Sequence, residues 1–156
     1  MELEFRNVTE ENFFEFIELE VKPEQKNCFF FKSTKPNMMS LAQAHVYEGS
    51  QIIAVYDRDT MVGSMFFTPC TDSQEKPRKA WLTRFMIDQR YQGKGYGRQA
   101  MKMLFDIIKK ENGGEPVNLG LSYEPENTLA ASLYASLGFR PTGEVMEGQV
   151  VVRKEL

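Results

Sequence analysis

The stretch RYQGKGYGRQA, residues 90–100, places three glycines within five positions, directly before an amphipathic segment. Gly93, Gly95 and Gly97 carry no side chain, so the backbone can adopt conformations closed to other residues and a ligand can approach it closely. The amides they expose lie where a helix is expected to begin, and a helix N-terminus attracts anions through its free N–H groups and its dipole. The pattern therefore predicts a binding site for a phosphate-bearing ligand.

Strand and helix patterns alternate on both sides of this loop. AWLTRFMID, residues 80–88, reads as a strand that leads into the loop, and VNLGLSY, residues 117–123, reads as a buried strand. A helix is predicted over 127–138, with Asn127 as its N-cap and Gly138 just beyond its last turn. The helix that follows the glycine loop is predicted to carry one apolar stripe and to stop at ENGG; the stripe comprises Tyr96, Ala100, Met103, Leu104, Ile107 and Ile108.

The remaining segments supply further strands and two more helices. Helices are predicted over 11–19 and over 40–48, the second with Ser40 as its cap. Strand patterns cover 3–9, a hairpin over 51–68 that turns at 57–59, and a last hairpin of 139–145 with 149–156 that turns at 147–148, while 70–79 reads as a polar loop. The order predicts an α/β fold in a single domain over residues 1–156, with a mixed central sheet of about seven strands and helices on both faces.

Composition excludes several classes of protein. Apolar residues make up 42% and charged residues 26% of the chain, which is typical of a globular protein, and no apolar run approaches the roughly 18 residues of a membrane span. Cys28 and Cys70 lack the spacing of a zinc site or a disulfide framework, and the single histidine, His45, is expected on a helix surface. There is no basic stripe and no secretory leader pattern. We expect a cytoplasmic protein with no metal and no nucleic-acid or membrane partner.

Charge is unevenly distributed along the chain. Residues 1–24 hold eight acidic and two basic side chains, a local charge of −6 within a chain whose net charge is −3. An acidic region of this kind either forms an ordinary solvated helix face or attracts a cationic substrate over a distance.

Three phosphate-binding patterns compete for the glycine loop. A Walker A loop requires a hydroxyl after Gly-Lys, but Gly95 follows Gly93-Lys94. The run from Gly95 to Ala100 satisfies a dinucleotide fingerprint formally, yet too little chain follows it to build the βαβ repeats of that fold. The third pattern, Gln/Arg-x-x-Gly-x-Gly/Ala, is met by residues 92–97, after a strand and at the start of a helix.

This third pattern resembles the pyrophosphate loop of the GCN5-related N-acetyltransferases (GNAT). WLTRFMID is similar to the fourth strand of that family, and NTLAASLYASLGF, residues 127–139, is similar to its "N…A…LY…GF" segment. Within the family the chain most resembles bacterial spermine/spermidine (diamine) acetyltransferases, on RFMIDQRYQGKGYGR, EPENTLAASLYASLGF and TGEVMEGQVVV. The resemblance extends over nearly the whole chain.

The resemblance implies a role for individual residues. Phe85, Met86 and Ile87 would hold the pantetheine arm of acetyl-CoA through the main chain, and an N–H near Met86 or Ile87 would stabilise the oxyanion. Asn127 would lie beside the cofactor, and Tyr134 would protonate the leaving thiolate, although its helical spacing with Ala130 is also typical of a core residue. The pyrophosphate would be held by Gln92, Gly93, Lys94, Gly95, Tyr96, Gly97 and Arg98.

The general base is not evident from the sequence. Many relatives carry a carboxylate in the fourth strand, where this chain has Thr83 and Arg84, neither of which is a base at neutral pH. A water chain or an acid from elsewhere would be needed, with Glu18, Glu20 and Glu24 as candidates. The run Phe29–Phe31 reads either as core or as an apolar lining for the methylene chain of a polyamine.

The resemblance implies direct transfer of an acetyl group to a primary amine of a small cationic substrate, with spermidine or spermine first. Two alternatives stay open: another amine, such as an aminoglycoside, an amino acid or a protein N-terminus, and a non-catalytic acyl-CoA-binding module. Homodimers are common among relatives, and the sequence itself leaves the oligomeric state open.

Overall fold

The computed structural model describes residues 1–26, 35–70 and 74–156. Two features named above, Cys28 and the run Phe29–Phe31, lie outside these ranges. No helix within the described ranges is long and apolar enough to cross a bilayer.

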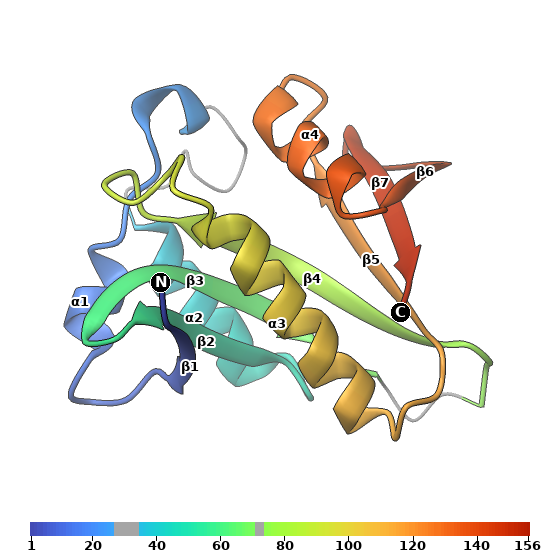
Figure 1. Cartoon of the computed structure of the whole chain (residues 1–156), viewed down its shortest axis with the longest axis horizontal. Coiled ribbons are helices and arrows are strands. Elements are labelled where there is room, and N and C mark those ends of the chain that lie inside the picture. The colour runs from blue at the N-terminus through green and yellow to red at the C-terminus, as the bar shows by residue number, and fades with distance from the viewer. Residues whose placement is uncertain (27–34, 71–73) are drawn as a thin grey trace.

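The described chain forms one seven-stranded mixed sheet, as the alternating patterns predict (Figure 1). The order across the sheet is β1-β2-β3-β4-β5-β7-β6, and only β4 and β5 pair in parallel. The strands are β1 (Leu3–Asn7), β2 (Gln51–Asp57), β3 (Thr60–Thr68), β4 (Arg78–Ile87), β5 (Val117–Tyr123), β6 (Arg140–Met146) and β7 (Gln149–Glu155). Because β7 lies between β5 and β6, the last hairpin folds back and pairs through its second strand.

Helices cover both faces of the sheet. They are α1 (Phe13–Ile17), α2 (Pro36–Val46), α3 (Tyr96–Glu111) and α4 (Thr128–Ser136), with a short 3₁₀ helix, η1, over Pro23–Gln25. Figure 1 shows α3 running across the front of the sheet and α2 behind it. The larger core lies under α3 and α4, where Leu104 and Tyr134 pack on alternate residues of the strands, while Phe16 of α1 belongs to a second core on the opposite face.

Two predicted features of the helices are wrong in detail. The second helix begins at Pro36, so Ser40 is not its cap but a buried residue one turn inside, where its hydroxyl donates to the Pro36 carbonyl at 3.2 Å. The buried face of α3 is rotated from the predicted stripe: Met101 and Phe105 are buried, whereas Met103 and Ile107 are partly exposed. Half of the residues of this helix are apolar, so the pattern alone does not choose between adjacent faces.

Strand β4 is longer than predicted. It begins at Arg78, inside the segment predicted as a polar loop, because Arg78 and Lys79 pair with Val117 and Asn118 of β5. Both predicted hairpin turns are confirmed, and each holds a residue in the left-handed region, Arg58 (φ 55°) and Glu147 (φ 52°).

Candidate active site

The parallel strands β4 and β5 separate halfway along β4. Their pairing runs from Arg78↔Val117 to Leu82↔Leu121, after which β4 continues to Ile87 without β5 beside it. Figure 1 shows the two strands diverging towards the loop that precedes α3. The last residues of β4 therefore have a neighbouring strand on one side only, within the described sheet.

A β-bulge at Thr83 marks the point of separation. On the β3 side Phe67 pairs with Leu82 and Phe66 pairs with Arg84, so Thr83 is the extra residue. Beyond the bulge, the Asp88 amide donates to the Val62 carbonyl of β3 at 2.9 Å. Because hydrogen-bonded and non-bonded pairs alternate along an antiparallel ladder, the main-chain groups of Phe85 and Ile87 point away from β3, towards the gap.

The glycine loop is anchored by polar side chains that turn into the protein. Asp88, almost completely buried, accepts hydrogen bonds from the Glu20 amide (3.0 Å) and from the backbone and guanidinium of Arg90. Burial would raise the pKa of Asp88, but these hydrogen bonds outweigh it and hold the pKa below its usual range. Gln92 donates through Nε2 to the Ile87 carbonyl (2.9 Å) and to Gln25 (2.8 Å).

The start of α3 has no side-chain cap. Its N-cap is Gly95 in the left-handed region (φ 88°), so the first amides of the helix receive no side-chain acceptor from it. A Cβ atom added at Gly93 would meet nothing within 4 Å, and one at Gly95 would meet only the methyl carbon of Met1, at 3.8 Å. The first turn is fixed from outside by the Tyr96 hydroxyl, which donates to Asp57 at 2.6 Å. The backbone of residues 93–95 is thus exposed, and the hydrogen bond from Tyr96 to Asp57 fixes the start of the helix that follows.

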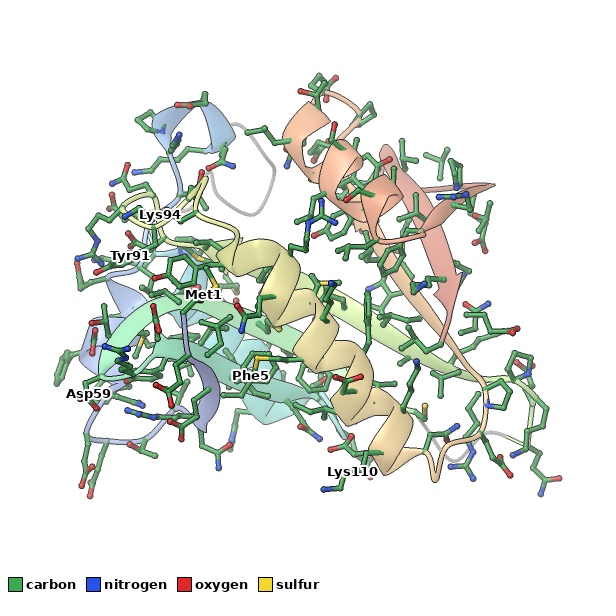
Figure 2. The ribbon with its side chains drawn as sticks, in the orientation of Figure 1. Met1, Phe5, Asp59, Tyr91, Lys94 and Lys110 are labelled. Carbon is green, nitrogen blue, oxygen red and sulfur yellow. The ribbon has the colours of Figure 1, made fainter. Side chains whose placement is uncertain are left out.

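A cavity of about 510 Å³ lies between the diverging strands, the glycine loop and α4. Of the residues that the family resemblance singles out, all but one line this cavity: Phe85, Met86, Ile87, Gln92, Gly93, Gly95, Tyr96, Gly97, Arg98, Asn127 and Tyr134. The exception is Lys94, whose Nζ donates to the Arg90 carbonyl (3.1 Å) and lies 5.5 Å from the centre of the Tyr91 ring. Figure 2 shows Lys94 and Tyr91 on the same side of the loop.

Tyr134, on α4, lines this cavity. Its ring stacks on Tyr123 at a centroid distance of 5.9 Å and meets Phe139 edge-on at 5.7 Å. The residue is 8% exposed, and burial raises the pKa of its hydroxyl well above the ordinary value of 10.0. Tyr134 is therefore both a core residue and a protonated group beside the cavity. Asn127, at the start of the same helix, is the predicted N-cap and accepts from the Ala130 amide at 3.2 Å.

The acids suggested as bases do not line the cavity. Glu18 pairs with Lys35 (2.5 Å) and Glu20 with Lys26 (3.3 Å), both on the surface, and Glu24 lies in the exposed first turn of η1. The described carboxylates that do line the cavity are Glu124, just beyond β5, and Glu147, in the β6–β7 turn. Sequence reasoning missed both, although position 124 continues the alternation of β5 onto the face opposite Tyr123.

Arg84 lies in the strand where the family resemblance leads us to expect a carboxylate, and it points to α2. Its Nη1 donates to Ser40 (2.8 Å) and its Nη2 to Gln43 (2.5 Å), and burial lowers its pKa. The Arg84 guanidinium is thus held by side chains of α2, on the face of the sheet opposite α3.

Comparison with known proteins agrees with this geometry. The family model described as the acetyltransferase (GNAT) family matches residues 9–139. A spermine/spermidine N(1)-acetyltransferase of Bacillus subtilis (strain 168) is 30% identical over 159 aligned residues, which cover 100% of both chains.

Two solved structures share the fold. The PaiA N-acetyltransferase of Thermoplasma acidophilum, in complex with coenzyme A, has a TM-score of 0.71 at 17% identity over 100% of both chains. The spermidine N-acetyltransferase of Vibrio cholerae, in complex with CoA and spermine, has a TM-score of 0.71 at 19% identity over 99% of this chain and 95% of the other. The chain belongs to the acetyltransferase (GNAT) family, and it is an acyltransferase enzyme.

Proposed function

We propose that this enzyme transfers the acetyl group of acetyl-CoA to a primary amine of a polyamine such as spermidine or spermine. The observation that carries the proposal is that a diverging strand end and an uncapped, glycine-lined helix start border the same cavity. The substrate class is supported by the full-length similarity to a curated spermine/spermidine acetyltransferase.

The proposed cofactor site fits the chemistry of coenzyme A. The amides at Gly93, Gly95 and the start of α3 offer donors for a pyrophosphate, and Arg98 adds a positive charge at the cavity wall. Lys94 contributes in this proposal only through its charge on the outer side of the loop, and Asn127 by fixing the start of α4.

The pantetheine arm is proposed to lie along the free side of β4. The main-chain groups of Phe85 and Ile87 face that gap, so an amide-bearing arm can pair with them as a strand would. By the same alternation, the main-chain N–H and C=O of Met86 face β3. In this proposal Met86 therefore lines the site without a main-chain hydrogen bond to the pantetheine arm. Of the two candidates Met86 and Ile87, Ile87 is the one whose N–H faces the gap, so we assign the oxyanion donor to the Ile87 N–H.

The proposed transfer needs three proton movements. The ammonium gives one proton to solvent through a water chain, the neutral amine nitrogen attacks the thioester carbonyl, and the nitrogen of the tetrahedral adduct gives up a second proton to water as the C–S bond breaks to release a thiolate. Tyr134 gives its hydroxyl proton to that sulfur and regains a proton from solvent. The hydroxyl is protonated at neutral pH, because an ordinary tyrosine has a pKa of about 10 and burial raises the pKa of Tyr134 further.

Mass spectrometry of reactions that contain the protein, acetyl-CoA and a mixed amine panel tests the proposal. The panel contains spermidine, spermine and an aminoglycoside. An increase of one acetyl group on spermidine or spermine is the expected result. Acetylation of the aminoglycoside alone would replace the substrate class. Acetyl-CoA binding in calorimetry with no acetylated product would contradict the proposed function.

A further inference from the structure

The sheet divides the cavity lining into two faces. Along β5, Leu121 and Tyr123 pack with the core under α3 and α4, so Ser122 and Glu124 project to the opposite face. On β7, Val150 and Val152 belong to the same core, so Gln149 shares the opposite face with Ser122. The proposed cofactor groups lie on the α3–α4 face, and a second set of polar side chains lies on the other.

Arg98 and Glu124 follow this division, whereas Arg84, which also lines the cavity, is held against α2 on the same face as Glu124. Arg98, whose guanidinium donates to Ser136 of α4 at 2.9 Å, lies on the α3–α4 face. Glu124 lies on the opposite face. Glu147 lies in the β6–β7 turn, directly after Met146, and Met146 pairs with Gln149. An anionic cofactor and a cationic acceptor are thus offered opposite charges in separate parts of one cavity.

Three polar side chains across β5 and β7 form a hydrogen-bonded chain. The Ser122 hydroxyl donates to Gln149 Oε1 at 2.6 Å, and Gln149 Nε2 donates to Glu124 Oε1 at 3.3 Å. A carboxylate only accepts hydrogen bonds, so Glu124 fixes which way the Gln149 amide turns, and Ser122 completes the chain. All three residues line the cavity, and Glu124 is partly exposed to it.

We propose that Glu124, held in place by Gln149 and Ser122, binds an ammonium group of the acceptor and determines the preference for cationic amines. The inference rests on the proposed function and adds a residue to it. Gln149 occupies one carboxylate oxygen and leaves the other for the substrate, so the carboxylate is oriented before the substrate arrives. Gln149 and Ser122 are positioning residues in this arrangement.

The Arg84 guanidinium does not cancel this charge. Arg84 is the charged residue of β4 among the described lining residues, and its two hydrogen bonds to Ser40 and Gln43 hold its guanidinium against α2. Glu147 adds a second negative charge at the turn.

Steady-state kinetics of E124Q with spermidine test the inference. The variant should raise the KM for spermidine about 10- to 100-fold, since a charge-assisted hydrogen bond is lost, with little change in kcat or in the KM for acetyl-CoA. E126Q is the matched control: it removes the same charge two residues away, on an exposed side chain outside the cavity lining, and should leave all three constants unchanged.

The positioning residues are tested by their dependence on Glu124. Q149L should raise the KM for spermidine without lowering kcat, and S122A should do so to a smaller extent. In the double variant E124Q/Q149L the effects should not add, because Gln149 acts through the carboxylate that is already lost. Additive effects would assign Gln149 a contact of its own and overturn the positioning role.

The outcomes separate the inference from the proposed function. If the native protein acetylates no polyamine, the proposed function fails. If it acetylates spermidine and E124Q keeps the same KM, the inference alone fails. A fall in kcat with unchanged KM would also overturn the inference, and a KM effect in E147Q that is absent from E124Q would move the binding group to the turn. Thermal melting and acetyl-CoA calorimetry confirm that each variant is folded.

Discussion

Tyr134 combines two properties that usually belong to different residues. Its ring packs in the core between Tyr123 and Phe139. Tyr134 also lines the cavity in which the acetyl transfer is proposed to take place. The helical spacing of Ala130 and Tyr134 predicts a core residue and the family resemblance predicts an acid, and the position in the structure is compatible with both.

We expect Tyr134→Phe to separate these properties. The ring remains, so stacking and stability should change little, while loss of the proton donor should lower kcat about 100-fold or more. Acetyl-CoA affinity should stay within about threefold of the native value. Stopped-time product analysis with spermidine measures kcat, and calorimetry measures the affinity. An unchanged kcat would assign the thiolate proton to another group.

Asp88 is a buried acid that joins the segment between α1 and η1 to the end of β4 and the glycine loop. We expect Asp88→Asn to lower the free energy of unfolding by about 1–3 kcal/mol at pH 7, because a carboxylate hydrogen-bonded to Arg90 and the Glu20 amide is removed. Urea unfolding of both proteins measures this difference. Asp106→Asn, at an exposed position on α3, is the control and should be neutral.

The same pair of proteins should differ in pH dependence. The pKa of Asp88 is lowered in the folded state, so its stabilisation is complete above the unfolded value of about 3.9 and is lost as the pH falls through the folded value. The difference in unfolding free energy between native protein and Asp88→Asn should therefore shrink below about pH 4. A difference that stays constant down to pH 2 would show that Asp88 stabilises without its charge.

At the scale of elements, the glycine loop is the part that the sequence predicted in most detail. The loop is predictable because all its parts are close in sequence: consecutive residues form the end of a strand, the loop and the start of a helix, and three of them are glycines. We expect Gly95→Val to weaken acetyl-CoA binding at least 10-fold, because a β-branched side chain is strained at φ 88° and stands where a phosphate would approach.

Gly113→Val separates strain from steric block. Gly113 also has a positive φ (66°) with nothing within 4 Å of an added Cβ, but it lies beyond the far end of α3. Both variants should lose stability, and only Gly95→Val should lose affinity. Equal affinities in calorimetry would contradict the assignment of the loop to the cofactor.

Features that depend on distant residues were not predictable in the same way. The bulge at Thr83 depends on its pairing with β3, and the rotated face of α3 depends on the Phe105–Phe139 contact. The chain of Ser122, Gln149 and Glu124 exists because β7, rather than β6, pairs with β5. Residue patterns predicted all the strands but not which of the last two would be the neighbour.

At the scale of the whole molecule, the sheet consists of two arms that are hydrogen-bonded to each other over the first half of β4. One arm holds β1 to β4 and the other holds β5, β7 and β6. The proposed cofactor lies between the open ends of the arms. Of the acids that concentrate charge in residues 1–24, Glu2, Glu4, Glu18 and Glu20 are paired with basic side chains, which reduces the field they exert.

A ligand that bridges the arms should stabilise both together. Acetyl-CoA at about 100 times its Kd should add about 2.7 kcal/mol and raise Tm by about 5 to 10 °C. Hydrogen exchange should slow at residues 83–87 and at the start of α4, while β3 changes little. Protection confined to one arm would contradict a bridging site, and Gly95→Val should show a reduced shift in Tm.

The free side of β4 also bears on how such a protein can change over generations. Hydrogen bonds made by main-chain N–H and C=O groups do not depend on the type of side chain at the same residue. Which residues positions 85 and 87 tolerate should therefore depend on packing more than on the ligand. Under the proposed assignment, the cofactor site is defined by the shape of the backbone more than by the identity of its side chains. A fold shared at 17% identity with the Thermoplasma acidophilum enzyme is what such a constraint permits.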